Sequence, residues 1–272
     1  MPISSKDALT LAMAFDEAER TRVRTRAASQ VHRDMTFEDA YAVQEAWRRI
    51  RLERGEVEIG RKIGLTSRAM QLSVGIDEPD YGFLTDAMVL DDGATIPADR
   101  FIEPRFEVEL GFKMKKRLEG PAVTIFDVLD ATDWIAPSFE VIDNRAHFTD
   151  PETGERRKVF DTISDNASNA GVIWGGRPVR PEEVDLRMVP AILYRNGKIE
   201  ETGVSAGVLG HPANGLVWLA RRLSAKGVAI EAGEFVLSGS FTRPIFGRPG
   251  DTLQCDFGPL GQVSCSIGPE VG

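Results

Sequence analysis

The sequence predicts a mixed α/β chain of the α+β kind, with helices at its N-terminal end and strands through most of the remainder. Apolar residues recur at spacings of three and four along residues 5–52, as on one face of a helix. Residues 103–112 instead alternate apolar and polar side chains, as in a strand. A length of 272 residues suits one large domain with an appendage. We therefore expect an N-terminal helical segment over residues 1–58 and a main domain over residues 59–272.

The N-terminal segment is expected to hold two amphipathic helices. The first runs from Ser5 to about Ser29, and the second begins at a capping box formed by Thr36 and Asp39 and stops at Gly55. Neither helix carries a group of residues suited to chemistry. We expect both to pack against the main domain or a neighbouring subunit.

The strand at residues 103–112 places Glu107 and Glu109 on one face, about 6–7 Å apart at the backbone for a rise of roughly 3.3 Å per residue. Two carboxylates at this spacing, with a third from elsewhere, suffice for a hard cation such as Mg²⁺. The same pattern is typical of an ordinary half-exposed strand with a polar face. Taken alone, the short E-x-E spacing favours that simpler interpretation.

A third carboxylate comes from the next predicted strand. Residues 125–134 are predicted to form a helix that leads into the apolar run at residues 135–142, and Glu140 interrupts this run. A carboxylate buried among Phe139, Val141 and Ile142 is costly unless it is paired, hydrogen-bonded or bound to a metal. Glu140 is therefore interpreted as the third ligand.

Two further ionisable residues stand in suggestive settings. Lys62 lies in a short apolar stretch between Gly60 and Gly64, where the backbone can approach a ligand closely. Such a lysine is commonly solvated at a strand edge, but beside a bound carboxylate it can orient that group or polarise an enol. Asp80 lies in the turn at residues 78–82, where an aspartate is commonly a turn former.

The C-terminal half completes the predicted elements. Residues 161–171 have the composition of a loop that could hydrogen-bond a substrate, and residues 214–223 are amphipathic at helical spacing. Strands are predicted at residues 235–238 and 251–257. Cys255 and Cys265 fall in strand-like alternation and are interpreted as structural thiols.

Composition restricts the partners. A formal net charge of −9 argues against nucleic acid and anionic membrane surfaces, because both require a basic footprint. The first thirty residues lack the apolar run of a secretory signal, and nowhere do eighteen apolar residues follow one another. We expect a soluble, cytoplasmic protein whose partners are small molecules or proteins.

Several motifs occur in a consistent order: residues 60–66 (GRKIGLT), 78–82 (EPDYG), 104–109 (PRFEVE), 139–143 (FEVID), 165–168 (DNAS), 209–214 (LGHPAN) and 233–240 (GEFVLSGS). Together they resemble the fumarylacetoacetate hydrolase superfamily, and most closely its branch of hydratases and decarboxylases of bacterial aromatic degradation. The resemblance extends from about residue 36 to the end of the chain. It implies a mixed β-roll or sandwich core with flanking helices, and a homo-oligomer that is a dimer or a pentamer of dimers.

The resemblance also assigns site residues. It implies Mg²⁺ or Mn²⁺ as cofactor, with Glu107, Glu109 and Glu140 as metal ligands, Lys62, Asp80 and Ser168 in the active site, and Ser240, Thr242 and Arg243 at the substrate. Fumarylacetoacetate hydrolases themselves have a further acidic ligand and a catalytic histidine, neither of which has a counterpart here. Hydrolysis of a carbon–carbon bond is disfavoured accordingly.

The implied activity is hydration at C4 of a 2-hydroxydienoate, or of its 2-oxo-enoate tautomer, to give a 4-hydroxy-2-oxo acid. Residues 150–153, 158–167 and 239–244 are similar to those of hydratases that act on a seven-carbon diacid, 2-oxohept-4-ene-1,7-dioate. Arg243 can bind the second carboxylate of such a diacid, or it can be a surface arginine beside a proline turn. In the second case the cation for that carboxylate is to be sought among Arg145, Arg156, Arg157 and Lys158. Hydration of a 2-oxopent-4-enoate, decarboxylation of a 4-oxalocrotonate-type 2-oxo-3-enedioate and a non-catalytic role in an enzyme complex are the alternatives.

Overall fold

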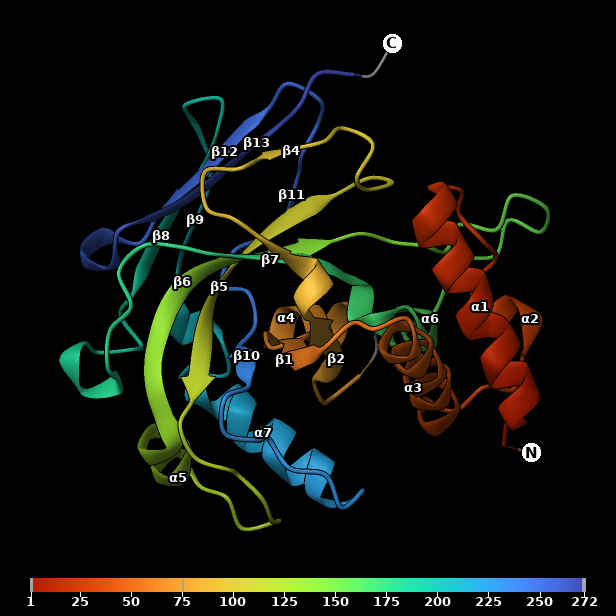
Figure 1. Ribbon diagram of the computed structural model, residues 1–272, viewed down its shortest axis with the longest axis horizontal. Helices are drawn as coiled ribbons and strands as arrows, with labels where there is room; N and C mark the ends of the chain where they lie inside the picture. Colours follow the sequence, from red (N-terminus) through yellow and green to blue (C-terminus); the bar gives the residue numbers. More distant parts are fainter. Residues whose placement is uncertain (1, 75, 271–272) are drawn as a thin grey trace.

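The computed structural model describes residues 2–74 and 76–270 (Figure 1). Its helices are α1 (Ser5–Thr21), α2 (Ala28–Val31), α3 (Phe37–Glu53), α4 (Arg68–Val74), α5 (Ile125–Ala131), α6 (Val159–Ser164) and α7 (Ala213–Ser224). Its strands are β1 (Glu58–Gly64), β2 (Asp80–Thr85), β3 (Val89–Leu90), β4 (Thr95–Ile96), β5 (Arg105–Met114), β6 (Thr132–Ile142), β7 (Asn169–Trp174), β8 (Pro190–Arg195), β9 (Lys198–Val204), β10 (Phe235–Leu237), β11 (Ile245–Phe246), β12 (Thr252–Asp256) and β13 (Gln262–Ile267).

The strands form two mixed sheets. Among the residues described, the larger sheet has the order β2-β1-β10-β5-β6-β7-β3, with β11 paired to β5, and the smaller has the order β4-β13-β12-β8-β9. The long strands β5 and β6 lie near the middle of the larger sheet and curve toward the smaller one (Figure 1). Two mixed sheets with helices outside them confirm the predicted α/β class.

The alternation predicted for residues 103–112 builds the core. Phe106, Val108, Leu110 and Phe112 of β5 are all fully buried. Burying one such side chain stabilises the fold by about 1.5–3 kcal/mol. Phe106 meets Phe139 of β6 edge to face, with ring centroids 5.9 Å apart. Because these apolar side chains take one face of β5, its glutamates are held on the other.

The N-terminal helices pack beside β1 and β2, away from the smaller sheet (Figure 1). The predicted capping box is present, with Thr36 and Asp39 bonding to each other's backbone N–H groups at the start of α3. Trp47 of α3 stacks on Phe15 of α1 and meets Phe83 of β2 edge to face, at centroid distances of 5.9 and 6.3 Å. The helical segment therefore packs directly on the sheet, and the domain boundary after residue 58 stays a prediction.

Two predicted helix boundaries are wrong. The first helix ends at Thr21 rather than near Ser29, because Arg22 adopts a left-handed conformation with φ of 60°. The helix predicted over residues 125–134 ends at Ala131 because Thr132 begins β6, where it pairs with β5. Strand pairing prevailed there over a helical pattern that continued beyond it.

The loop predicted at residues 161–171 is also wrong in part. It contains the end of helix α6, a single 3₁₀ turn at Asn166–Ser168 and the start of β7. The small polar side chains that suggested a loop are mostly buried, and they bond to neighbouring backbone groups. The segment is thus a rigid corner beside the site described below.

The remaining predictions concern thiols and membranes. Cys255 and Cys265 are buried on the adjacent strands β12 and β13, and both are free thiols. Burial raises the pKa of both thiols, to about 12 for Cys265. Of the helices in the described part of the chain, none is long and apolar enough to span a bilayer.

Candidate active site

Three glutamates converge at the centre of the larger sheet. Glu107 of β5 lies directly opposite Glu140 of β6 in the antiparallel register, and Glu109 follows two residues along β5 on the same face. One carboxylate oxygen from each lies within 4.8 Å of the others. The chain pairing itself therefore brings together the three predicted metal ligands.

The hydrogen bonding of this cluster fits a hard divalent cation. Glu109 and Glu140 are fully buried. One oxygen of Glu109 accepts the backbone N–H of Gly239 at 2.8 Å, and one oxygen of Glu140 accepts the side-chain amide of Asn169 at 2.8 Å. The other oxygen of each carboxylate has no hydrogen-bond partner among the residues described. Buried, unsatisfied carboxylate oxygens are costly, and Mg²⁺ or Mn²⁺ takes such oxygens as ligands.

The electrostatics of the cluster also favour a bound cation. Burial, and after it the charge of Glu140, raises the pKa of Glu107 to about 7. The same two causes raise the pKa of Glu109 well above its usual value. Carboxylates in this state resist ionisation unless positive charge is supplied. A bound cation is the natural source of that charge.

Lys62 supplies part of the positive charge that the glutamates require. Its side chain rises from β1, is 3% exposed and places Nζ 3.2 Å from a Glu140 oxygen. Burial by itself lowers the pKa of Lys62, but the carboxylates of Glu140 and Asp80 outweigh it and raise the pKa overall. Lys62 is therefore a permanent cation beside the acid cluster.

Asp80 lies at the start of β2, opposite Gly64 of β1. Both of its carboxylate oxygens are buried without a hydrogen-bond partner in the described residues. A Cβ added to Gly64 would stand 2.2 Å from one of these oxygens, so glycine leaves the space that Asp80 occupies. Burial raises the pKa of Asp80, Lys62 opposes the shift and Glu140 adds to it.

The predicted substrate residues line a pocket of about 430 Å³ that reaches Glu107. Ser240 Oγ donates to the backbone carbonyl of Thr242 at 2.9 Å, and Thr242 Oγ1 is buried without a partner in the described part of the chain. Arg243 stands at the pocket rim with its side chain 82% exposed, 2.7 Å from Glu201. These residues and the acid cluster thus share one opening.

Ser168 takes a different position from the other predicted catalytic residues. Its hydroxyl donates to Asn144 at 2.8 Å, and within the described residues it forms no hydrogen bond with the three glutamates. It closes a turn in which Asn166, Ala167 and Ser168 have φ of 51°, 48° and 62°. Three consecutive left-handed non-glycine residues are strained, and such strain concentrates at functional sites.

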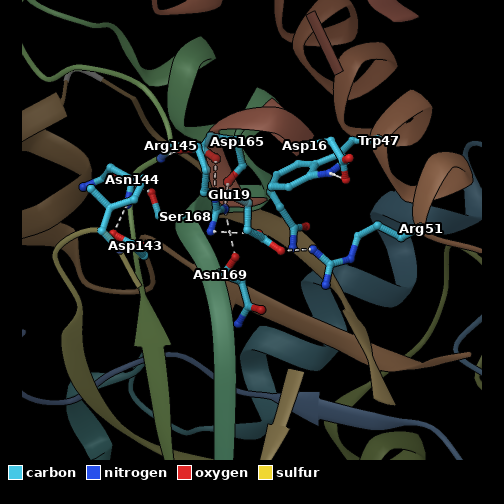
Figure 2. Close-up of polar contacts among 12 residues, drawn as sticks. Asp16, Glu19, Trp47, Arg51, Asp143, Asn144, Arg145, Asp165, Ser168 and Asn169 are labelled. Atoms are coloured by element: carbon cyan, nitrogen blue, oxygen red, sulfur yellow. Dashed lines mark hydrogen bonds and ion pairs between the residues drawn. The ribbon is translucent and has the colours of Figure 1, made fainter. Parts of the chain in front are cut away.

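Sequence reasoning missed Asn169, and it considered Arg145 only as an alternative cation for the distal carboxylate. Asn169 orients Glu140 through its side-chain amide. Arg145 is fully buried, pairs with Asp165 and donates to the backbone carbonyls of Asp165 and Asn169, and Glu19 of α1 lies 3.7 Å away (Figure 2). The dense polar composition of residues 161–171 was the available signal. It did not reveal which groups would face the acids.

Histidine has no part in the cluster. Among the residues that the structure describes, the candidate metal group contains the three glutamates alone. Burial lowers the pKa of His211, the histidine that precedes α7.

Known proteins resemble this chain in sequence and in structure. No family model matches the chain. The chain is 56% identical over 255 residues to 2-oxo-hept-4-ene-1,7-dioate hydratase of Escherichia coli, covering 94% of this chain and 96% of that protein. The solved structure of 4-oxalocrotonate decarboxylase from Pseudomonas putida G7, complexed with magnesium and adipate, has a TM-score of 0.92 at 35% identity, covering 97% and 98% of the two chains.

A more distant structure shows the fold alone. Fumarylpyruvate hydrolase from Pseudomonas aeruginosa, in complex with Mn²⁺ and pyruvate, has a TM-score of 0.58 at 13% identity. The match covers 79% of this chain and 91% of that one. The predicted fold type is thereby confirmed.

Proposed function

Because this chain belongs to the fumarylacetoacetate hydrolase superfamily, in its branch of hydratases and decarboxylases, we propose that it is a metal-dependent hydratase, a carbon–oxygen lyase. Its proposed substrate is 2-oxohept-4-ene-1,7-dioate, or the 2-hydroxydienoate tautomer, and its product is 4-hydroxy-2-oxoheptane-1,7-dioate. The reaction belongs to aromatic catabolism through homoprotocatechuate, which derives from 4-hydroxyphenylacetate. The convergence of Glu107, Glu109 and Glu140 carries the proposal.

The three glutamates would hold Mg²⁺ or Mn²⁺. Their unpartnered oxygens, and the positive charge that their raised pKa values call for, support this assignment. When bound, a divalent cation would polarise the carboxylate and 2-oxo oxygens of the substrate and stabilise the negative charge that develops there. One related structure holds magnesium and a more distant one holds Mn²⁺. Activity of the metal-free protein after addition of each ion distinguishes the two.

Lys62 would bind a negatively charged group of the substrate, and Asp80 would transfer a proton. Lys62, fixed beside Glu140, would hold the C1 carboxylate or the enolic oxygen of the substrate. Asp80 has a raised pKa and two oxygens free of partners among described residues, which suits a group that takes up and releases a proton. A positioned acid–base group of this kind typically contributes about 10²–10⁴-fold.

The remaining proposed site residues would bind the substrate. Ser240 and Thr242 line the pocket that reaches Glu107, and the buried hydroxyl of Thr242 is available to a ligand. Ser168 would act at the edge of the site, where its hydroxyl now bonds to Asn144. Arg243 at the rim is the sequence-based candidate for the distal carboxylate, in competition with the two arginines described below. We also propose a cytoplasmic location and a homo-oligomeric state, a dimer or a pentamer of dimers.

Decarboxylation of a 2-oxo-3-enedioate is the second candidate. The likeness to 4-oxalocrotonate decarboxylase favours it, because a divalent cation held by the glutamates would stabilise the same dienolate charge in either reaction. A mono-acid hydratase of the 2-oxopent-4-enoate kind is a further alternative within the branch. A non-catalytic partner has least support, because Lys62 and the glutamates are all in place.

One assay separates these reactions. The protein, supplied with Mg²⁺, is incubated with five-, six- and seven-carbon 2-hydroxydienoates and with a 2-oxo-3-enedioate while dienol absorbance and CO₂ are followed. The proposed function predicts loss of the seven-carbon dienol fastest, without CO₂. Stoichiometric CO₂ release would establish the decarboxylase instead, and fastest loss of the five-carbon dienol would establish the mono-acid hydratase.

A further inference from the structure

Arg105 occupies the row of the sheet next to the acid cluster. Arg105 of β5 pairs with Ile142 of β6, two residues along each strand from the pair formed by Glu107 and Glu140. Side chains two residues apart share a face, about 7 Å apart. Asn169 of β7, which pairs with Ile142, reaches back to Glu140 at 2.8 Å, so this row adjoins the cluster on the same face.

Arg105 is a cation without an ion-pair partner in the described residues, and its charge opposes the rise in the pKa of Glu107. Its guanidinium lies over the ring of Phe246, its cross-strand neighbour on β11, at 5.5 Å. Within residues 2–74 and 76–270 it makes neither an ion pair nor a side-chain hydrogen bond. The half-buried cation is therefore available to an anion.

Arg157 approaches the same place from the segment before α6. Its Nη1 donates to Asn144 Oδ1 at 2.6 Å, and the same oxygen accepts the hydroxyl of Ser168 at 2.8 Å. Ser168 precedes Asn169, the residue that orients Glu140. Figure 2 shows Ser168 and Asn144 side by side at this end of the polar network. Hydrogen bonds thus connect Arg157 to the edge of the metal-ligand cluster.

The acids around Arg157 are already engaged. Asp165 pairs with Arg145 at 2.5 Å, and Asp161 accepts two hydrogen bonds from Ser29 at 2.6 and 2.7 Å. Arg157 forms no ion pair within the described residues. Burial lowers the pKa of Arg157, and Arg105 lowers it further against the opposing charge of Asp165. The guanidinium of Arg157 is thus bonded to the Asn144 amide oxygen and to no carboxylate in the described residues.

The spacing matches the substrate. The terminal carbons of an extended seven-carbon diacid lie roughly 7–8 Å apart for C–C bonds of about 1.5 Å. A carboxylate placed at the glutamate cluster would therefore leave the other at the Arg105 row. We propose that Arg105 and Arg157 bind the distal carboxylate and select diacids, an inference that rests on the proposed function for the placement of the C1 end. Arg243, by contrast, is 82% exposed and already paired with Glu201.

Binding of unreactive analogues tests this without turnover. Calorimetry on the Mg²⁺-loaded protein would compare 2-oxoheptanedioate with 2-oxoheptanoate, which ends in a methyl group. Loss of a charge-assisted contact predicts that Arg157→Met weakens diacid binding about 10- to 100-fold. Mono-acid binding should change less than about threefold, because the mono-acid makes no such contact. Arg105→Met should weaken diacid binding by a similar factor and leave mono-acid binding nearly unchanged.

Arg156→Met is the matched control, because Arg156 stacks on the same Phe148 ring as Arg157 but is exposed. It should bind both analogues as the wild type does. If Arg157→Met fails to fold, Arg157→Lys and Arg105→Met decide, since both should weaken diacid binding selectively. Equal affinities in the wild type, equal losses for both analogues, or loss of selectivity in Arg243→Met alone would overturn the inference.

The outcomes also separate this inference from the proposed function. Diacid selectivity that depends on Arg157, in a protein that hydrates no dienoate, supports the distal site and rejects the hydratase. Normal hydration of the seven-carbon dienoate, with diacid selectivity unchanged in Arg157→Met and Arg105→Met, rejects the distal site alone.

Discussion

Single residues in the acid cluster carry charges that do not balance. Lys62 is the cation that forms an ion pair with the cluster in the described chain, and it faces four carboxylates, those of Glu140, Asp80, Glu107 and Glu109. Burial makes each unpaired charge costly, which is why the pKa values of Glu107 and Glu109 rise. A divalent ion would restore the balance.

Replacing Glu109 by glutamine removes one charge and one ligand. We expect Glu109→Gln to lower the rate of Mg²⁺-dependent hydration more than about 100-fold. Loss of a residue that only orients a metal ligand typically costs about 10- to 100-fold, and Glu109 is proposed to be a ligand itself. Without metal the variant should melt no lower than the wild type, because the removed charge was repelled by Glu107 and Glu140. Calorimetry with and without Mg²⁺ measures this. Asp133→Asn, at an exposed position of β6, is the control. Wild-type stabilisation by Mg²⁺ in Glu109→Gln would refute the assignment.

The titration of Glu107 predicts a pH dependence. Its pKa is about 7 in the folded, metal-free protein, against an ordinary value of 4.5. Between these values the unfolded chain has released the proton that the folded protein keeps, so the metal-free protein loses stability as pH rises through this window. A cation needs the ionised carboxylate. The rise in Tm caused by Mg²⁺ should therefore be larger at about pH 8 than at about pH 5. A rise of equal size at both would contradict the cluster's role.

Among the elements, the corner between α6 and β7 fixes the site. The side-chain amide of Asn166 exchanges two hydrogen bonds with the backbone of Phe83 in β2, at 2.8 and 3.0 Å. This holds the left-handed turn against the sheet and sets the position of Asn169, which orients Glu140. The corner thus links β2, which carries Asp80, to the metal ligands.

Asn166→Ala tests that link. It leaves two buried backbone groups without partners, each costing about 1–3 kcal/mol, so a loss of roughly 2–6 kcal/mol in unfolding free energy is expected. Asn196→Ala is the control, because Asn196 also has a positive φ and bonds through its side chain but is exposed. Urea denaturation compares the two. Mg²⁺ affinity should fall in Asn166→Ala alone, and equal effects in both variants would rule out a special role for this corner.

The elements also show what sequence can predict here. Period-two alternation predicted β5, and the cost of burying Glu140 predicted its partnership, because both depend on local pattern. The end of α5 and the corner at Asn166 were missed, because strand pairing and contacts with distant Phe83 decide them. Asn169 was missed for the same reason. No spacing in the chain indicates that its amide reaches Glu140.

For the whole molecule, assembly is the open prediction. Leu9 and Met13 of α1 are 45% and 59% exposed, on a helix whose other face packs on α3. Apolar side chains left exposed on such a helix favour contact with another chain. We expect light scattering at micromolar concentration to give a mass that is a multiple of 29.9 kDa. Leu9→Glu should shift the mass downward if α1 lies in the interface. A stable monomer in the wild type would contradict the proposed homo-oligomer.

The central claim is that the three buried glutamates hold a divalent ion on which hydration depends. The most direct measurement is the rate at which protein stripped of metal converts the seven-carbon dienoate as Mg²⁺ is added back, with the product followed by proton NMR. We expect negligible conversion without metal, saturable recovery with Mg²⁺ and a 4-hydroxy-2-oxo diacid as product. Full conversion after exhaustive chelation would contradict it.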